Sequence, residues 1–209
     1  MTPPDEEPAG REWPRLVLAS TSPYRRALLE RLALPFDSID PGWKEVRRSD
    51  PDETVRENAV GKARAGGALR PDAWILASDQ VGYCDGQILE KPGTPVRAIE
   101  QLQFLSGREH TLHTGVVLRS PDGLEEIEIV VAHLRMRPLR LEQIEAYVRR
   151  EAPLDCAGSY KSEALGILLF DSLRCDDPTA IVGLPLIATR RLLEAAGLDP
   201  LDLLHRRGR

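Results

Sequence analysis

A short apolar run that leads through a polar turn into an amphipathic helix, over residues 16–32, constrains the fold of this chain most strongly. Leu16–Ala19 contains only apolar residues, which is typical of a strand buried on both faces. Ser22 suits the N-cap of the following helix, and Pro23 suits its first position, where no amide hydrogen is needed. The helix then carries an apolar stripe that includes Leu28 and Leu32. We therefore predict that this helix packs on a sheet in an α/β fold.

The same helix begins with Arg25 and Arg26, where helices usually carry acidic residues. Free amides and the macrodipole make a helix N-terminus positive, so two further cations there are unfavourable unless an anion is bound. A phosphate held by the hydroxyls of Ser20, Thr21 and Ser22, the free amides and one or both arginines would satisfy every donor. The alternative for an arginine pair is that both side chains are solvated. The hydroxyls and the preceding strand favour the phosphate.

The composition is that of an ordinary globular protein and argues against a nucleic-acid-binding function. With 209 residues, of which 42% are hydrophobic and 29% charged, the chain can form one α/β domain or two small lobes that share a sheet. The net charge of -5 and the lack of a long basic tract argue against binding to duplex nucleic acid. A small anionic ligand needs only a local positive pocket.

Cysteine usage and hydropathy both favour a cytoplasmic protein. The three cysteines are widely spaced and form no CxxC pair, so we expect neither a disulfide framework nor a zinc site, and a reducing compartment fits. No apolar run approaches the ~20 residues that a membrane span requires, and the first residues lack a signal-peptide pattern. We expect residues 1–14, which are rich in Pro and Glu, to form a disordered tail, residues 15–203 a single domain of two lobes, and residues 204–209 a frayed basic tail.

A second helix, predicted from its cap at Asp50 to about Ala68, carries a lysine on its inward face. Val55, Ala59 and Lys62 lie on one side of this helix, which should face the core. Such a lysine either extends its ammonium group out to solvent or meets a buried anion. For the helix considered alone, the solvated alternative is favoured.

The next predicted strand, Trp74–Ala77, ends in Ser78, Asp79 and Gln80. Polar residues at the carboxyl end of a central strand commonly face a ligand crevice in α/β sheets. Asp79 is therefore a candidate metal ligand or general base, and its alternative role is to cap a turn. Lys91 follows a hairpin predicted at Asp85–Gly86, from which it either reaches a phosphate or remains solvated.

The rest of the chain predicts further helices and strands. His110, His113 and His133 do not share metal-ligand spacing, so we expect them to be sheet or surface residues. We predict a helix from Pro95 to just before Gly107, an antiparallel hairpin of His110–Leu118 and Glu126–Leu134 with one face buried, a helix over Leu141–Arg150, a strand over Gly166–Phe170 and a last helix from about Pro185 to near Gly197.

Several of these stretches, taken in order, closely resemble the Maf family of nucleoside triphosphate pyrophosphatases, and most closely its branch that acts on 7-methyl-GTP. The resemblance extends from about Leu16 to Leu201. It is carried by ASTSPYRRALLERL, SDQV, EKPG, SGREHTLHTG, DCAGSYKSEALGI and DPTAIVGLPLI.

The resemblance implies a fold, a reaction and partners. The fold would be a Maf/Ham1-like (anticodon-binding/ITPase-like) α/β fold with an elongated mixed β-sheet, flanking helices and a central cleft between two lobes, usually as a homodimer. The reaction would be hydrolysis of a nucleoside triphosphate to the monophosphate and pyrophosphate, with Mg²⁺ or a similar divalent ion such as Mn²⁺ or Co²⁺.

The resemblance also implies roles for individual residues. Asp79 matches the catalytic proton acceptor, and with Glu45 it matches the acidic residues near the metal. The positions that separate the substrate branches are Tyr24, Gln80 and Glu163. Arg25, Lys62 and Lys91 match the family's phosphate-binding cations, and the hydroxyls of Ser20 and Ser22, already expected to hold a phosphate, complete the predicted phosphate site. The chain departs from the family pattern at Glu90, where a glycine is expected, and at Lys44, where an acidic residue is expected.

Substrate choice has a physical basis, because methylation at N7 gives guanine a positive charge. The ring of Tyr24 can attract this charge by ~0.5 to 2 kcal/mol, and Glu163 can offset it while accepting hydrogen bonds from the guanine edge. The alternative for Tyr24 is that it merely packs beside the helix. Alternative functions are a preference for dTTP, UTP or another modified triphosphate, inosine triphosphate included, and a nucleotide-binding role in regulating septum formation. Tyr24 and Glu163 argue against the other triphosphates, and Asp79 with three candidate cations favours an enzyme.

Overall fold

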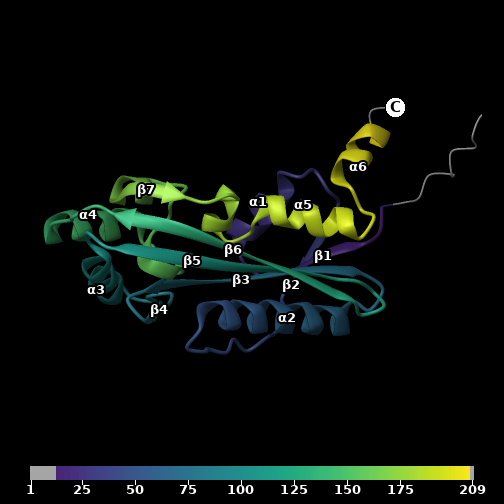
Figure 1. Ribbon diagram of the computed structural model, residues 1–209, viewed down its shortest axis with the longest axis horizontal. Coiled ribbons are helices and arrows are strands. Elements are labelled where there is room, and N and C mark those ends of the chain that lie inside the picture. The colour runs from purple at the N-terminus through teal and green to yellow at the C-terminus, as the bar shows by residue number, and fades with distance from the viewer. Residues whose placement is uncertain (1–12, 208–209) are drawn as a thin grey trace, which may run out of the picture.

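A mixed sheet runs along the length of the molecule in the computed structural model, which describes residues 13–207 (Figure 1). Over these residues the sheet has seven strands in the order β2-β1-β3-β5-β6-β7, with β4 paired to β3. The strands are β1 (Leu16–Ala19), β2 (Asp37–Ile39), β3 (Trp74–Cys84), β4 (Gln87–Leu89), β5 (Glu109–Arg119), β6 (Glu125–Met136) and β7 (Phe170–Arg174). The pairs of β1 with β2 and with β3 are parallel and all others are antiparallel, which confirms the predicted α/β fold with a mixed sheet.

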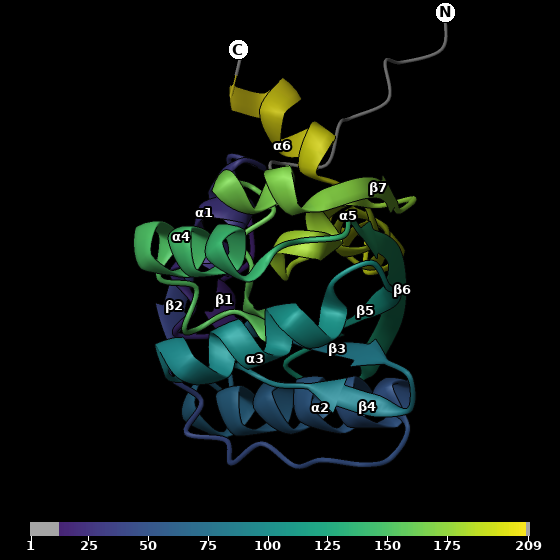
Figure 2. The same ribbon diagram turned by 90° about the vertical axis from the view of Figure 1, so that its left-hand side faces the viewer.

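Helices cover both faces of this sheet. The α-helices are α1 (Pro23–Glu30), α2 (Pro51–Leu69), α3 (Pro95–Leu105), α4 (Leu141–Glu151), α5 (Leu186–Ala195) and α6 (Pro200–Arg207), and short 3₁₀ helices are η1 (Ala157–Ser159), η2 (Leu165–Leu169) and η3 (Pro178–Val182). Figure 2, an end-on view, shows α2 below the sheet and α1, α4 and α5 above it. No helix of residues 13–207 combines the length and the apolar character that a membrane crossing requires.

β1 is buried on both faces, as predicted, because it lies between these two helical layers. Leu16 and Leu18 pack in a core with residues of α1 and α5. Val17 and Ala19 pack on the opposite face, in a core with Ala59 of α2. A third core lies at the far end of the sheet, where α3 and α4 pack against the ends of β5 and β6.

The strand predicted at Trp74–Ala77 does not end before Ser78, because β3 continues without interruption to Cys84. Its backbone pairs with β5 from Ile75 to Tyr83, polar residues included. On the opposite edge, β1 pairs with β3 only as far as Leu76, and β4 begins to pair at Gly82. The polar residues therefore lie beyond the end of β1 but in the middle of β3.

Other predicted elements are confirmed at their caps and turns. Ser22 and Asp50 accept hydrogen bonds from the first turns of α1 and α2, and Thr94 does so for α3. Asp85 and Gly86 both have positive φ, as the predicted two-residue hairpin requires. In β6, by contrast, the predicted buried face is only half-buried before Ala132. Side chains on both sides of this part of the strand, such as Ile127 and Val130, pack against core clusters.

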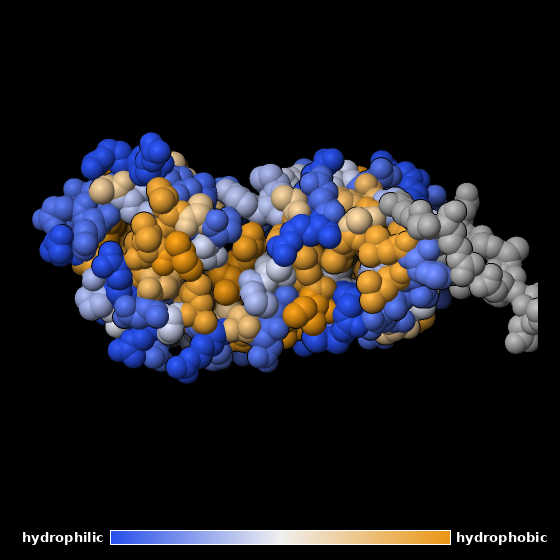
Figure 3. Space-filling view, turned by 90° about the horizontal axis from the view of Figure 1, so that it is seen from above, coloured by the Kyte–Doolittle hydropathy of each residue, from blue (hydrophilic) through white to orange (hydrophobic). Residues whose placement is uncertain are grey.

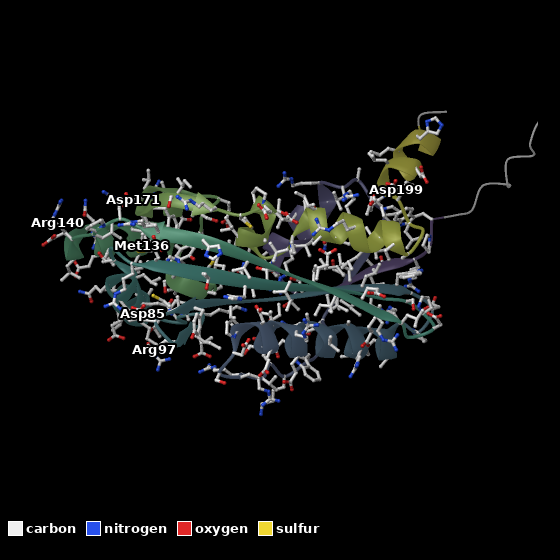
Figure 4. All side chains as sticks on the ribbon, in the orientation of Figure 1. Asp85, Arg97, Met136, Arg140, Asp171 and Asp199 are labelled. Carbon is white, nitrogen blue, oxygen red and sulfur yellow. The ribbon has the colours of Figure 1, made fainter. Side chains whose placement is uncertain are left out.

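Two segments near the C-terminus differ in secondary structure from what the sequence pattern indicated. The strand predicted at Gly166–Phe170 begins only at Phe170, because η2 occupies the preceding residues and Gly166 packs directly against the backbone of Lys161. The tail predicted to fray from residue 204 lies partly in α6. This helix forms because Asp199, labelled in Figure 4, accepts a hydrogen bond from the amide of Leu201 at 2.8 Å and a proline follows it.

The ends of the predicted domain are only partly described. Residues 1–12 of the predicted N-terminal tail and residues 208–209 lie outside the described residues. Trp13, within the predicted tail, packs against the core on the α1 and α5 face.

The close contact of α2 with the sheet generates a stability prediction for two adjacent glycines. A Cβ at Gly66 would lie 2.9 Å from Cγ2 of the buried Ile75 and 3.0 Å from the Cβ of Ala19, whereas one at Gly67 would meet only the guanidinium of Arg119, at 3.2 Å. Helix propensity favours alanine over glycine equally at both positions. We expect Gly66→Ala to be less stable than Gly67→Ala by about 1–3 kcal/mol, since overpacking a core has costs of that order. Urea denaturation measures this difference, and equal stabilities would contradict the packing of α2.

Candidate active site

A cavity of about 340 Å³ lies where β1 ends and α1 begins, and nine of the ten residues predicted for the site line it. This volume is within the range of small-molecule sites. The nine residues are Ser20, Ser22, Tyr24, Arg25, Glu45, Lys62, Gln80, Lys91 and Glu163. The tenth, Asp79, is 4% exposed and lines an adjoining hollow together with Glu45, Gln80 and Lys91. The structure therefore brings the predicted residues together from separate parts of the chain.

The turn between β1 and α1 holds Arg25 against the cavity. Ser20 Oγ accepts a hydrogen bond from the amide of Ser22 at 3.1 Å, and the Nε of Arg25 donates to the carbonyl of Gly183 at 2.9 Å. Burial lowers the pKa of Arg25, and the charges of Asp79 and Glu45 partly oppose this effect. Arg26 points elsewhere and pairs with Glu30 on the exposed side of α1 at 3.1 Å. The two neighbouring arginines thus have different surroundings.

Lys62 is buried and meets two carboxylates, so the solvated alternative for this lysine is wrong. Its side chain is 8% exposed, and its Nζ donates to Asp79 Oδ1 and to Glu45 Oε1, each at 2.6 Å. Burial raises the pKa of Glu45, but the hydrogen bond and charge of Lys62, with the charges of Lys91 and Arg25, lower it overall. One ammonium group thereby joins α2, β3 and the loop before α2.

Asn58 was missing from the predicted site, although it also contacts Asp79. Its side chain, on a residue that is 2% exposed, donates from Nδ2 to Asp79 Oδ2 at 3.0 Å. Asn58 precedes Lys62 by four residues, and Thr54, also buried, precedes Asn58 by four. The sequence signal for Asn58 is this row of polar residues at helical spacing, which runs along the face that carries Val55 and Ala59.

The three residues predicted to set substrate choice, Tyr24, Gln80 and Glu163, all line the cavity. Gln80 is tied to η3, because its Nε2 donates to the carbonyl of Ala180 at 2.7 Å and to Thr114 Oγ1 at 3.0 Å. Burial, together with the nearby Cys156 and Asp155, raises the pKa of Tyr24, although a hydrogen bond with Lys161 opposes the shift. Its hydroxyl therefore stays protonated at neutral pH.

Both departures from the family pattern are exposed. Glu90 forms an ion pair with Arg47, which lies in the loop that carries Glu45. The negative charge of Glu90 beside Lys91 is therefore balanced by Arg47, which lines the same hollow. Lys44 is exposed next to Glu45.

The three histidines of the predicted hairpin take no part in this cavity. His110 is buried, its Nε2 lies 2.9 Å from the hydroxyl of Tyr160, and burial lowers its pKa to about 4. His113 contacts Asp52 at 2.6 Å, and His133 is exposed on β6. Their predicted role as sheet or surface residues agrees with these positions.

The carboxylates present fit a magnesium ion that also binds phosphate. Among residues 13–207 no three side chains of His, Cys, Asp or Glu are grouped as a metal site. Mg²⁺, however, is commonly bound by one or two carboxylates, substrate phosphates and water rather than by a complete protein cage. Glu45 and Asp79, which share one Lys62 ammonium group, are such a pair.

The buried ion pair generates a second stability prediction. Lys62→Met would leave the buried carboxylate of Asp79 without its cation, and breaking a buried pair in this way costs about 3–5 kcal/mol. Arg26→Met removes the same charge from an exposed pair and should cost less than about 1 kcal/mol. Chemical denaturation at neutral pH compares the two variants with the unmodified chain. If Lys62→Met cost no more than Arg26→Met, the burial of the ion pair would be refuted.

Comparison with known proteins identifies the family of this chain. The sequence matches the family described as Maf-like protein over residues 15–196. A 7-methyl-GTP pyrophosphatase of Xanthomonas axonopodis pv. citri is 49% identical over 189 residues, which cover 89% of this chain and 98% of that protein. A 7-methyl-GTP pyrophosphatase of Aromatoleum aromaticum is 50% identical over 187 residues, 88% of this chain and 96% of that protein. Among solved structures, the Ham1 protein of Staphylococcus aureus has a TM-score of 0.46 at 16% identity, covering 58% of this chain and 71% of that one. The chain belongs to the family of Maf-like proteins.

Proposed function

We propose that this protein is a nucleoside triphosphate pyrophosphatase that hydrolyses 7-methyl-GTP to the monophosphate and pyrophosphate, and so removes a modified nucleotide. One observation carries the proposal. A cavity of nucleotide-compatible size is lined by three cations from three separate elements, Arg25, Lys62 and Lys91, and two carboxylates adjoin them. Relatives at about 50% identity that are named 7-methyl-GTP pyrophosphatases support the substrate.

The cations match the charge that the reaction develops. Attack of water at the α-phosphorus breaks the bond to the oxygen that bridges the α- and β-phosphates, and this oxygen leaves with pyrophosphate. Fixed cations stabilise such charge most effectively when they are already in place. Arg25, which lines the cavity, donates from Nε to the carbonyl of Gly183 and from Nη1 to Ser20 Oγ, and further N–H groups remain to bind a phosphate. Lys62 has a third N–H to donate beyond its two carboxylate partners.

Asp79 is the residue that we propose takes the proton of the attacking water. Its two oxygens accept hydrogen bonds from Lys62 and Asn58, and both contacts fix the position of the carboxylate that acts as the base. Ser20 Oγ accepts from Ser22, so its own proton remains to donate to a phosphate oxygen. Ser22 lines the cavity beside it.

We propose that Glu45 and Asp79 hold a divalent cation, with Mg²⁺ first and Mn²⁺ or Co²⁺ as alternatives. When bound, such an ion supplies a positive charge that neutralises phosphate oxygens. We further propose a cytoplasmic homodimer. Exposed apolar side chains support self-association, and they include Leu165, Ile167 and Leu168 of η2, which are 41%, 49% and 63% exposed. Figure 3 shows apolar residues gathered over the left-hand part of the upper face, where α4 and β7 lie.

Pyrophosphate release from a panel of normal and methylated triphosphates tests the proposed reaction. We expect turnover with Mg²⁺, fastest with 7-methyl-GTP, and a loss of about 10²- to 10⁴-fold in kcat/KM for Asp79→Asn, because a general base contributes that much. Asp85→Asn is the matched control, since Asp85 lies at the β3–β4 turn away from the cavity and Asn-Gly suits the same turn (Figure 4). No turnover of any triphosphate with Mg²⁺, Mn²⁺ or Co²⁺ would refute catalysis, and nucleotide binding without turnover would favour a regulatory role.

Substrate preference tests the roles of Tyr24 and Glu163. We expect Tyr24→Leu to reduce the preference for 7-methyl-GTP over GTP by about 2- to 30-fold, which corresponds to the ~0.5 to 2 kcal/mol of a cation–π contact. Glu163→Gln should also reduce this preference, because it removes the charge that offsets the methylated base. Glu142→Gln on the exposed side of α4 serves as the control. Steady-state kinetics with the two nucleotides give the ratio, and an unchanged ratio for Glu163→Gln would exclude its role.

A further inference from the structure

We propose that Asn58 is a positioning residue that fixes the orientation of the Asp79 carboxylate and ties it to the loop that carries Glu45. The inference rests on the proposed function and adds a residue that acts through Asp79 rather than on the substrate.

Every polar atom of the Asn58 side chain has a full set of partners. Nδ2 donates to Asp79 Oδ2 at 3.0 Å and to the carbonyl of Val46 at 3.0 Å. Oδ1 accepts from the amide of Val46 at 2.8 Å and from the indole Nε1 of Trp43 at 3.2 Å. An asparagine can donate two hydrogen bonds and accept two, so the whole capacity of this side chain is used.

These partners allow only one orientation of the Asn58 amide. The indole N–H of Trp43 and the backbone N–H of Val46 are donors only, so the atom facing them has to be the oxygen. The amino group is thereby directed at Asp79, whose carboxylate can only accept. The loop thus determines which atom Asp79 meets, and Asp79 in turn receives a donor on each of its oxygens, one from Lys62 and one from Asn58.

This arrangement links Asn58 to both carboxylates of the site, directly to Asp79 and through the neighbouring residues to Glu45. Glu45 lies between Trp43 and Val46 in the sequence, so the segment that Asn58 binds on both sides is the segment that presents Glu45. The indole of Trp43 also lies against Gly61, where a Cβ would be 2.3 Å from the ring, so the segment is seated on α2. Asn58 therefore holds Asp79 on β3 and the Glu45 segment in one fixed relation.

Thr54 provides a matched control on the same helix. It is also buried, and it holds the end of the same loop, because its Oγ1 accepts from the amide of Arg48 at 3.0 Å. Within the described chain its hydroxyl bonds with Arg48 and Asp50 rather than with Asp79, and it donates to the carbonyl of Asp50 at 2.9 Å. Thr54→Val thus loosens the loop from α2 without changing a contact of Asp79.

The test compares Asn58→Leu, Asn58→Asp and Thr54→Val in the full chain. Asn58→Asp keeps the shape and both acceptor contacts with the loop, but it replaces the amino group that donates to Asp79 and to the carbonyl of Val46 with a carboxylate oxygen. We expect both Asn58 variants to lose about tenfold or more in kcat for 7-methyl-GTP while KM changes less than about threefold, since small displacements of reacting groups have effects of this size. Thr54→Val should keep kcat within about threefold of the unmodified chain.

A second measurement reports on the loop itself and does not depend on turnover. Acrylamide quenching measures how accessible the Trp43 indole is, and so whether the loop remains packed on α2. The signal of Trp43 is obtained by subtracting the emission of the matching Trp43→Phe variant. We expect Asn58→Asp to keep more of the original protection than Asn58→Leu, yet to lose at least as much kcat, because a carboxylate beside Asp79 Oδ2 repels it.

The outcomes separate this inference from the proposed function. Turnover by the unmodified chain with kcat retained in Asn58→Asp would overturn the positioning role and leave the proposed function intact. If the decrease in kcat were proportional to the increase in Trp43 quenching across all three variants, Asn58 would act only by attaching the loop to α2, and the positioning of Asp79 would be excluded. No turnover by the unmodified chain overturns the proposed function and this inference with it. If Asn58→Leu does not fold, the isosteric Asn58→Asp still decides between these outcomes.

Discussion

The site depends on one buried interaction, the contact of the Lys62 ammonium group with the carboxylates of Asp79 and Glu45. A buried lysine without an acceptor would be strongly unfavourable, as would a buried aspartate without a donor. Each therefore requires the other, and each is carried by an element whose position is set by a core: α2 by its small residues against the sheet, and β3 by its pairing with β5. Glu45 is the more exposed partner and links the surface loop to this centre.

The inner face of α2 combines two tasks that normally conflict. Ala59, Ala63 and Gly66 are small enough to let the helix lie close to β1 and β3, and that closeness brings Lys62 and Asn58 within hydrogen-bonding distance of Asp79. Larger side chains at the small positions would move the polar ones away from the strand. The stability of this layer and the geometry of the proposed active site are thus set by the same contact.

Local signals predicted the elements of this fold better than its long-range pairings. The caps at Ser22 and Asp50 and the turn at Asp85–Gly86 were readable, because each involves neighbouring residues only. The continuation of β3 through Asp79 was not, since it depends on pairing with β5, more than thirty residues away. The resemblance to the family predicted which residues form one site, although they are far apart in the sequence. It could not supply Asn58, nor show that Arg47 balances the unexpected Glu90, because both depend on the path of the loop before α2.

Within residues 13–207, the change of neighbouring strand along one edge of β3 leaves a stretch of that edge unpaired. β1 stops pairing at Leu76 and β4 starts at Gly82, so that within the described chain residues 77–81 have a neighbouring strand on the β5 side only. At a rise of about 3.3 Å per residue, the interval from Leu76 to Gly82 is roughly 20 Å. The cavity lies at this gap in the sheet edge, because Gln80 lines it together with the β1–α1 turn and Lys91. The length of this open edge of β3 is therefore set by the residues at which the two flanking strands stop, and lengthening either strand would shorten it.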